Sequence, residues 1–401
     1  MHNMIEKADI SLNDVIGLLS KFNIAATYLV PTPTGMEKSI MDATSPLRSY
    51  LKENKIHDYD IQPQGTENKK LIEAKFIFED RIESVKVSFY RPETKSGDPR
   101  IWIYGLTKNA KSFNLIALFV YQNNLYIFNA SQKSVLDSIT NPASPLGKVA
   151  YELSQYISDT AAELLALLRD KTGDRFIPSV RSSDSSIGDT LEKLLGIKPN
   201  SNKAPDYKGI EIKSSRQDPK RTTAKNRVNL FSQVPDWKLS PVGTAMNMLN
   251  QYGYIIDGRL QLYCSVDAIK PNSQRLMLTV DENAQLLKTI EKLDSSDKSL
   301  MTWALSNLKN RLQEKHPESF WVKAETKMIS GREHFRYYKV IHTSKPIVSN
   351  LDYLLADGTV GLDLTMSQKT EKTVRDHGYL FKIWPEDLEL VFPKSLEHSL
   401  I

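Results

Sequence analysis

The spacing of apolar residues predicts a mixed α/β chain whose first part is rich in strands. Apolar side chains recur at helical spacing in residues 10–22 and 45–55. Strand patterns then follow one another closely, at 71–78, 84–91, 100–106, 115–121 and 125–131. Asn123 and Asn124, between the last two of these segments, favour a tight hairpin turn. So many short strands with few helices indicate a compact sheet or barrel-like domain that ends near residue 140.

Beyond residue 140 the pattern mixes helices and strands and then becomes β-rich. Helices are predicted at 149–171, 190–195, 240–252 and about 283–315. Strands are predicted at 209–213, 259–266 and 275–280, and in the β-rich part that closes the chain. The segment 172–189 is rich in Ser, Gly and Asp, which predicts a loop.

The composition of the 401-residue chain is that of a globular protein, with 40% hydrophobic and 25% charged residues. At roughly 150 residues per domain, its length suggests two or three domains. The single cysteine, Cys264, excludes a disulfide framework and a zinc site built on several thiolates. No apolar run approaches the roughly 20 residues that a membrane helix needs, and the first residues lack the apolar core of a secretion signal. We therefore expect a soluble, cytoplasmic protein with no membrane partner.

The net charge of +5 is small, but it is unevenly distributed. Between Lys203 and Arg227 the chain has eight basic and three acidic residues, an excess equal to that of the whole protein. A local basic cluster is typical of a surface that binds a phosphate backbone. A solvated basic loop is the commoner outcome for such a run, and the sequence leaves both interpretations open.

The segment 205–213, PDYKGIEIK, is the strongest candidate for chemistry. In a strand its two isoleucines point to one face, whereas Glu211 and Lys213 point to the other. A turn just upstream can bring the carboxylate of Asp206 beside Glu211. Two carboxylates and one ammonium group would then converge on one face of a sheet.

This set of groups suits the hydrolysis of a phosphodiester. Two hard oxygen ligands can hold a magnesium ion, which takes water and phosphate oxygens as its other ligands. The ion acidifies a bound water, and the ammonium group can stabilise the attacking hydroxide or the phosphate oxygens. A solvent-facing glutamate and lysine on an ordinary strand explain the segment equally well. Glu192 favours the nuclease interpretation, because it lies off the apolar stripe of its predicted helix, although a surface carboxylate is the alternative.

Residues 187–216, IGDTLEKLLGIKPNSNKAPDYKGIEIKSSR, resemble the catalytic core of the MvaI/BcnI restriction endonuclease family, which is related to the mismatch-repair nicking enzyme MutH. That family places a helix glutamate ahead of a Pro-Asp and a Gly-Ile-Glu-x-Lys motif, and the resemblance extends over roughly residues 150–395. It implies that Asp206 and Glu211 bind magnesium. It also implies that Lys213 assists the attacking water and that Glu192 supports the site.

The same resemblance indicates where DNA is read. Specificity in this family comes partly from loops near the C-terminus, and the matching segments here are 361–365 and 375–382. Family members tend to carry arginines, suited to bidentate reading of guanine, where this chain has Thr365 and Lys382. This departure leaves the target sequence open, and His377 suits a core or hairpin position as well as a DNA contact. The candidate DNA-binding residues of this part are Arg216, Asp363, Arg375, His377 and Lys382.

Residues 84–131 are similar to the pseudobarrel DNA-binding domain at the N-terminus of the EcoRII enzyme, in their strand pattern and in a polar arm between two strands. Side chains of this arm can enter a DNA groove, and a solvated turn is the alternative. The candidate DNA-binding residues of the arm are Arg91, Lys95, Asp98 and Arg100.

The expected fold class is α/β, with a PD-(D/E)xK (restriction endonuclease-like, MutH-related) catalytic core preceded by a β-rich DNA-binding pseudobarrel domain. The expected organisation has three parts. An EcoRII-like DNA-binding or effector domain occupies 1–140, a helical linker with the start of the catalytic domain occupies 141–185, and an MvaI/BcnI-like nuclease domain occupies 186–401.

The resemblances imply a monomeric Type II restriction endonuclease that hydrolyses double-stranded DNA at a short specific site with magnesium-activated water. The layout resembles that of an enzyme that cuts CCWGG, and the extra domain implies stimulation by a second copy of the target. A cognate DNA methyltransferase in a prokaryotic cytoplasm is the expected partner. Two alternatives remain open: a MutH-like nicking endonuclease of mismatch repair, and a non-catalytic DNA-binding regulator, which would have no need of the intact acidic pair and lysine.

Overall fold

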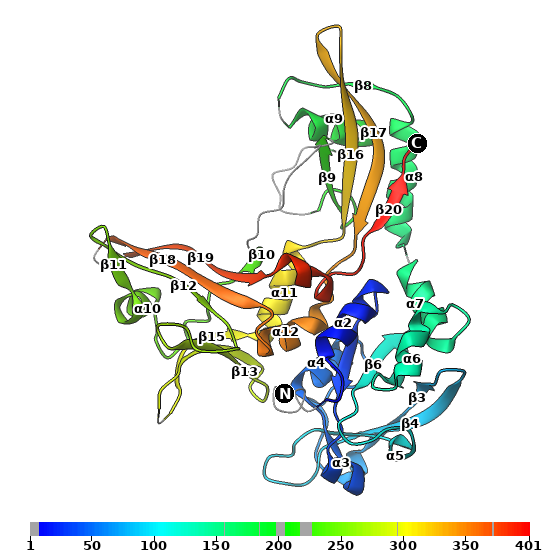
Figure 1. Cartoon of the computed structure of the whole chain (residues 1–401), viewed down its shortest axis with the longest axis vertical. Helices are drawn as coiled ribbons and strands as arrows, with labels where there is room; N and C mark the ends of the chain where they lie inside the picture. The colour runs from blue at the N-terminus through cyan, green and yellow to red at the C-terminus, as the bar shows by residue number, and fades with distance from the viewer. Residues whose placement is uncertain are drawn as a thin grey trace. The chain divides into compact units, whose positions relative to one another are not determined.

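The computed structural model describes residues 8–155, 157–183, 185–197, 205–216, 227–294, 296–370 and 373–401. The chain forms two compact units, each built from segments that are far apart in the sequence (Figure 1). The larger unit comprises Met1–Leu153, Arg227–Leu312 and Ile347–Val391, and the smaller unit comprises Ser154–Asn226, Gln313–Pro346 and Phe392–Ile401. The domain boundaries expected at residues 140 and 185 stay predictions. Within the described ranges no helix is long and apolar enough to cross a membrane.

A seven-stranded sheet forms the N-terminal part of the larger unit, in the order β1-β6-β7-β3-β4-β5-β2. The strands are β1 (Ala26–Leu29), β2 (Met41–Asp42), β3 (Lys70–Ile77), β4 (Ile82–Tyr90), β5 (Arg100–Ile103), β6 (Ile116–Tyr121) and β7 (Asn124–Asn129). The helices are α2 (Leu12–Lys21), α3 (Pro33–Lys38), α4 (Ser45–Glu53), α5 (Leu106–Asn109), α6 (Lys133–Asp137) and α7 (Pro145–Ser154), with 3-10 turns η1 (Thr66–Asn68) and η2 (Ser138–Thr140). Buried side chains of α4 and of the strands, such as Leu47, Phe76 and Phe89, share one core. The five predicted strands and both predicted helices are confirmed.

The β6–β7 hairpin turns one residue earlier than expected. Tyr121 pairs with Asn124, so the turn consists of Gln122 and Asn123, whose φ angles are 48° and 60°. Two successive residues with positive φ form the turn type that matches the twist of paired strands. Asn124 therefore belongs to β7 rather than to the turn.

Two further sheets belong to the larger unit. A five-stranded sheet has the order β10-β19-β18-β12-β11, and β13-β14-β15 form a meander. The strands are β10 (Val228–Ser232), β11 (Tyr254–Ile256), β12 (Arg259–Val266), β13 (Leu276–Asp281), β14 (Leu286–Glu291), β15 (Lys298–Ala304), β18 (Gly361–Thr370) and β19 (Thr373–Ile383). The helices are α10 (Ala245–Tyr252), α11 (Leu305–Lys315) and α12 (Leu351–Ala356), with 3-10 turns η3 (Val348–Asn350) and η4 (Pro385–Leu390).

The long helix expected at about 283–315 is wrong. Residues 286–304 contain the paired strands β14 and β15, and helix is confined to α11. The polar stretch DSSD at 294–297 lies between the two strands and separates two short apolar runs. Short runs of this kind do not distinguish strand from helix by their period, and here burial of Leu287, Leu300 and Trp303 in strand pairing decides the outcome.

The smaller unit contains a sheet in the order β20-β17-β16-β9, with β8 paired to β17. Its elements are α8 (Asp159–Thr172), β8 (Ile177–Pro178), α9 (Ser186–Leu195), β9 (Glu211–Arg216), β16 (Ser319–Ile329), β17 (Arg332–Thr343) and β20 (Leu396–Ser399). Leu164 and Leu168 of α8 and Leu191 of α9 share a buried core with Ile210 and the sheet, so both helices pack against it (Figure 1). Because β9 is the last strand of this sheet, its outer edge has no strand neighbour among the described residues.

The prediction of a single helix at 149–171 is wrong, because the structure has two helices there. The structure has α7 ending at Ser154 and α8 beginning at Asp159. The hydroxyl of Ser158 accepts the backbone N–H of Ala161 at 3.1 Å, which is the geometry of a helix N-cap. A capping serine followed by an aspartate is a helix-start signal, and apolar periodicity alone runs across it.

Within the larger unit, Tyr353 connects the N-terminal sheet to α12. Its hydroxyl lies 3.0 Å from the Thr27 hydroxyl and accepts the backbone N–H of Tyr28 at 3.1 Å. Next to Tyr353, Asp352 forms a 2.8 Å ion pair with Lys309 of α11, and the two side chains are 0% and 7% exposed. The N-terminal sheet is therefore joined to the later segments by buried polar contacts.

Candidate active site

A tight turn ahead of β9 brings the acidic pair together. The residues that flank Lys208 and Gly209 exchange backbone hydrogen bonds of 2.9 and 2.8 Å. The two turn residues have φ angles of 45° and 96°, and the second is a conformation that glycine adopts without strain. The reversal carries Asp206 back along the strand, where its Oδ2 accepts the backbone N–H of Ile212 at 2.9 Å. The Asp206 carboxylate thus lies beside the backbone of Ile212, the residue that follows Glu211.

Glu163 of α8 fixes this turn. Its carboxylate accepts hydrogen bonds from Lys208 Nζ at 2.7 Å and from the Tyr207 hydroxyl at 2.9 Å. Lys208 belongs to the basic run that the sequence singles out, yet its charge is paired with Glu163 at the protein surface. Four of the eight basic residues of that run, Lys203, Lys220, Arg221 and Lys225, lie outside the described residues.

The two faces of β9 differ as the strand pattern predicts. Ile210 and Ile212 pack in the core of the smaller unit, whereas Lys213 is exposed. β9 runs parallel to β16, and their register places Lys213 beside Trp321. Lys213 Nζ lies 4.9 Å from the centroid of the Trp321 ring, within the range of a cation–π contact. Sequence reasoning missed Trp321, because only the register of two distant strands brings it to this face.

Burial and neighbouring carboxylates raise the pKa values of Glu211 and Glu192. Burial raises the pKa of Glu211, and the charge of Asp206 raises it further against the opposing charge of Lys213. Burial also raises the pKa of Glu192, and Asp206 is the largest of the three carboxylates that add to this effect. Glu192 therefore shares an electrostatic neighbourhood with the acidic pair, as the sequence predicts. Carboxylates that repel one another gain from a cation placed between them.

The donor set fits a magnesium ion. Within the described part of the chain, no group of three or more His, Cys, Asp or Glu side chains is placed to hold a metal. The turn instead offers two carboxylates, from Asp206 and Glu211. Magnesium prefers such hard oxygen donors, and it commonly uses one or two carboxylates while it keeps water and substrate phosphate oxygens as its other ligands.

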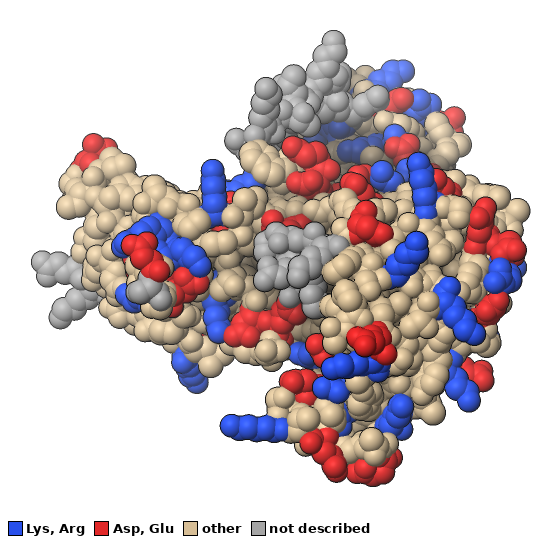
Figure 2. All heavy atoms as spheres, turned by 60° about the horizontal axis from the view of Figure 1, so that its bottom comes forward, with Lys and Arg blue, Asp and Glu red and all other residues tan. Residues whose placement is uncertain are grey.

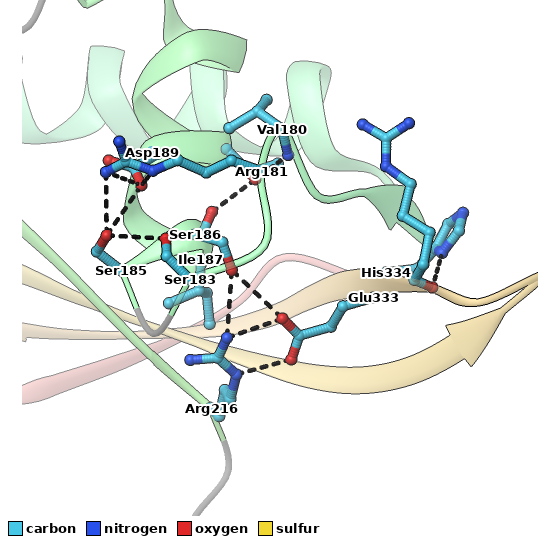
Figure 3. Close-up of polar contacts among 12 residues, drawn as sticks. Val180, Arg181, Ser183, Ser185, Ser186, Ile187, Asp189, Arg216, Glu333 and His334 are labelled. Atoms are coloured by element: carbon cyan, nitrogen blue, oxygen red, sulfur yellow. Dashed lines mark hydrogen bonds and ion pairs between the residues drawn. The ribbon is translucent and has the colours of Figure 1, made fainter.

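Arg216, at the end of β9, joins three elements of the smaller unit (Figure 3). Its Nε and Nη2 atoms donate to the two carboxylate oxygens of Glu333 on β17, each at 2.8 Å. The Ser186 hydroxyl, at the start of α9, donates to the same carboxylate at 3.3 Å and accepts from Arg216 Nη2 at 3.2 Å. Hydrogen bonding to Arg216 lowers the pKa of Glu333. The DNA contact expected for Arg216 stays a prediction, while Glu333 and Ser186 were missed because they lie far from the motif in sequence.

A second charged cluster lies on the five-stranded sheet of the larger unit. Asp363 accepts from Arg227 Nη2 at 2.5 Å on one oxygen and from Lys382 Nζ at 2.8 Å on the other. The Ser265 hydroxyl donates to the same carboxylate at 2.7 Å. The structure thus brings together two predicted DNA-binding residues and adds an arginine that the motif analysis missed. Thr365 lies on the same strand, and its hydroxyl donates to a backbone carbonyl of β19 at 2.7 Å.

The remaining candidates are not brought into this cluster. Arg375 is exposed on β19, and the side chain of His377 lies outside the described residues. In the N-terminal arm, Arg91 donates to the backbone carbonyls of Gly97 at 2.9 Å and of Gln62 at 3.2 Å. This guanidinium group is therefore held by two backbone carbonyls, one within the arm and one outside it.

The other arm residues differ in exposure. Lys95 and Asp98 are exposed, and Asp98 accepts from the Ser96 hydroxyl at 2.6 Å. Arg100 is half-buried on β5, and its Nε has no hydrogen-bond partner among the described residues. Lys95 and Asp98 are thus the arm side chains best placed to contact another molecule.

Comparisons with known proteins identify the family of this chain. The family model described as the MvaI/BcnI restriction endonuclease family matches residues 165–392. A comparison with curated proteins gives no match. Among solved structures, the chain is similar to the complex of restriction endonuclease MvaI with its cognate DNA, at 22% identity and a TM-score of 0.38 over 61% of this chain and 100% of that one. MvaI in the absence of DNA gives 21% identity and a TM-score of 0.41, over 62% of this chain and 100% of the other. Because the family match covers more than half of the sequence, the chain belongs to the MvaI/BcnI restriction endonuclease family.

Proposed function

We propose that this protein is a Type II restriction endonuclease that hydrolyses both strands of DNA at a short specific site. The observation that carries the proposal is the turn that sets Asp206 beside Glu211, with Lys213 on the same face of β9. Membership of the family supports the same reaction class.

The residues of β9 divide the chemistry between them. Asp206 and Glu211 hold magnesium, which supplies an acidified water and offsets negative charge on the reacting phosphate. Lys213 directs its ammonium group to the attacking oxygen or to a phosphate oxygen. Glu192 supports the acidic pair, because burial and the charge of Asp206 raise its pKa, which indicates that the carboxylates influence one another.

Recognition is assigned to the larger unit. Asp363 and Lys382, with Arg227, contact the target bases or the neighbouring backbone, and Arg375, His377 and the N-terminal arm add further contacts. The target we propose is CCWGG, and the residues of the arm (Arg91, Lys95, Asp98 and Arg100) contact a second copy that stimulates cleavage. The enzyme acts as a monomer in a prokaryotic cytoplasm, alongside a cognate methyltransferase that protects the host site.

The test is digestion of a mapped plasmid by the purified full-length chain, with magnesium and with a chelator. We expect discrete linear fragments that require magnesium, with ends that sequencing places at one short motif. Asp206→Asn is a matched control, because it removes a charge and keeps the shape. Nicked circles without linear product would favour a nicking enzyme, and equal cutting by Asp206→Asn would contradict the site.

A further inference from the structure

The outward face of β12 and β18 is polar along its length. The two strands pair antiparallel, with Gln261 opposite Ser367, Tyr263 opposite Thr365 and Ser265 opposite Asp363. The intervening residues, Leu262, Leu364 and Met366, are fully buried. Alternation along each strand therefore turns the odd-numbered residues from 259 to 265 and from 363 to 369 away from that core, and among them Ser367 is itself fully buried.

One end of this face carries three cations around a single open pocket of about 570 Å³. The pocket is lined by Arg259 of β12, Gln368 and Lys369 of β18, and Arg375 of β19. All three cations are exposed, and none of the described lining residues is acidic. Among the described residues, none of the three cations forms an ion pair with a carboxylate.

The other end of the same face shows the contrast. There Arg227 and Lys382 share the carboxylate of Asp363. Elsewhere too the surface of the protein mixes the two signs, with acidic and basic side chains interspersed over the face that Figure 2 shows. Among the described residues, three neighbouring cations without a paired carboxylate are thus a local exception, and their mutual repulsion favours a bound anion.

Arg259 is held in position for such an anion. Its Nε donates to the backbone carbonyl of Gln368 at 3.3 Å, and its Nη2 donates to the Ser367 hydroxyl at 2.5 Å. These bonds orient the guanidinium group on the strand, while the side chains of Lys369 and Arg375 form no hydrogen bond or ion pair among the described residues. A planar guanidinium group with two further cations suits the oxygens of a phosphate group.

We propose that Arg259, Lys369 and Arg375 form a binding site for a backbone phosphate of duplex DNA. The inference rests on the proposed function and deepens it, because it separates a positioning contact from the base-reading cluster at Asp363. Asp363 and Lys369 are six residues apart on β18, which is about 20 Å of strand. A phosphate held at one end fixes the register of the duplex, and the side chains at the other end read its sequence.

The test measures binding of duplex DNA to the full-length protein without magnesium, over a series of potassium chloride concentrations. Lys369→Gln and Arg375→Gln should each weaken target and non-target duplexes by a similar factor, and each should reduce the slope of log affinity against log salt by about one. The double variant should reduce the slope by about one as well, because the three cations hold a single phosphate. Lys292→Gln, an exposed lysine on a different sheet that pairs with Asp297, is the matched control and should leave the slope unchanged.

Four other outcomes would each lead to a different conclusion. Unchanged affinity and slope in the double variant, with normal wild-type binding, would contradict this site and leave the proposed function standing. A loss confined to the target duplex would show that the side chains read bases. If inorganic phosphate at equal ionic strength abolished wild-type binding but not that of the double variant, the site would be one for free phosphate. Wild-type protein that bound no duplex would contradict the proposed function itself.

Discussion

The catalytic strand of the smaller unit and the charged face of the larger unit use charge in opposite ways. Beside β9, burial and the charge of Asp206 raise the pKa of Glu211, and Lys213 contacts an aromatic ring instead of forming an ion pair with these carboxylates among the described residues. On the five-stranded sheet, Asp363 is instead saturated by Arg227, Lys382 and a serine hydroxyl. Excess negative charge in the first region would suit a divalent cation, whereas in the second region one carboxylate holds two cations in fixed positions. In the proposed function, the first region performs the chemistry, and the second region orients the side chains that contact DNA.

The largest effect is expected when the excess negative charge is removed. Asp206→Ala or Glu211→Ala should lower cleavage by about a thousandfold or more, equivalent to about 4 kcal/mol of barrier, because a lost ligand removes the metal and not the fold. Binding of target duplex should stay within a few-fold of wild type. Rates on a linear single-site substrate, with filter binding in calcium, measure both. Wild-type rates in Asp206→Ala would remove the site from β9.

Lys213 is the next test. Lys213→Ala should keep DNA and metal binding and cleave about a hundred- to a thousandfold more slowly, since one charged donor to the reacting oxygens is lost. Lys213→Arg should restore little, because a planar fork does not replace a compact ammonium group. Single-turnover rates separate this loss of chemistry from binding. High activity in Lys213→Arg would indicate a role limited to positive charge.

Trp321 offers the matched control for the lysine. Trp321→Phe keeps an aromatic face for Lys213 and should retain more activity than Trp321→Leu, which removes that face and keeps an apolar side chain. Equal rates in the two variants would show that the contact does not orient the lysine.

How much of this arrangement the sequence predicts depends on how local it is. The acidic pair and its lysine lie within eight residues, so strand alternation and a glycine turn are enough to place them. The Asp363 cluster draws on residues up to 155 positions apart, from Arg227 to Lys382, and the register of several strands brings them together. Trp321 and Glu333 reach the catalytic strand in the same non-local way. The helix wrongly expected at about 283–315 has the same origin, because pairing between β14 and β15 outweighs an ambiguous local pattern.

The contacts of Arg216 provide a smaller and more discriminating test. If Arg216 and Glu333 act together to hold α9 against β9, then Arg216→Ala and Glu333→Ala should each lower kcat by about tenfold and leave affinity for DNA nearly unchanged. Their effects should not add in the double variant, because each removes the same interaction. The loss of stability should be about 1 kcal/mol or less, since the pair is partly exposed.

A direct DNA contact by Arg216 predicts the opposite signs. Arg216→Ala would then weaken DNA binding, and Glu333→Ala would release the arginine and strengthen it. Affinities of the two single variants for the same duplex decide between these roles.

Asp363→Asn removes the negative charge of the Asp363 cluster and keeps the shape of the side chain. Two cations lose their shared counter-charge, so non-target duplex should bind a few-fold more tightly, while discrimination against a single changed base pair should fall by about tenfold. Ser265→Ala, which removes one neutral hydrogen bond to the same carboxylate, should have a smaller effect of the same kind. Unchanged discrimination in Asp363→Asn would place base reading elsewhere on the sheet.

The smallest effect concerns the N-terminal sheet, which shares the larger unit with the Asp363 cluster. If its arm binds a second target, full-length enzyme should cut a two-site plasmid a few-fold faster than a one-site plasmid, and a short target duplex added in trans should close the gap. Tyr353 joins this sheet to α12 through Thr27 and Tyr28. Tyr353→Phe leaves the Tyr28 N–H without that acceptor and should lower the free energy of unfolding by about 1–3 kcal/mol. Lys95→Gln, an exposed change in the arm, should instead reduce the stimulation and leave both the one-site rate and the stability unchanged. Equal rates on the two plasmids, with or without added duplex, would remove the second DNA site and leave the N-terminal sheet as a structural part of the larger unit.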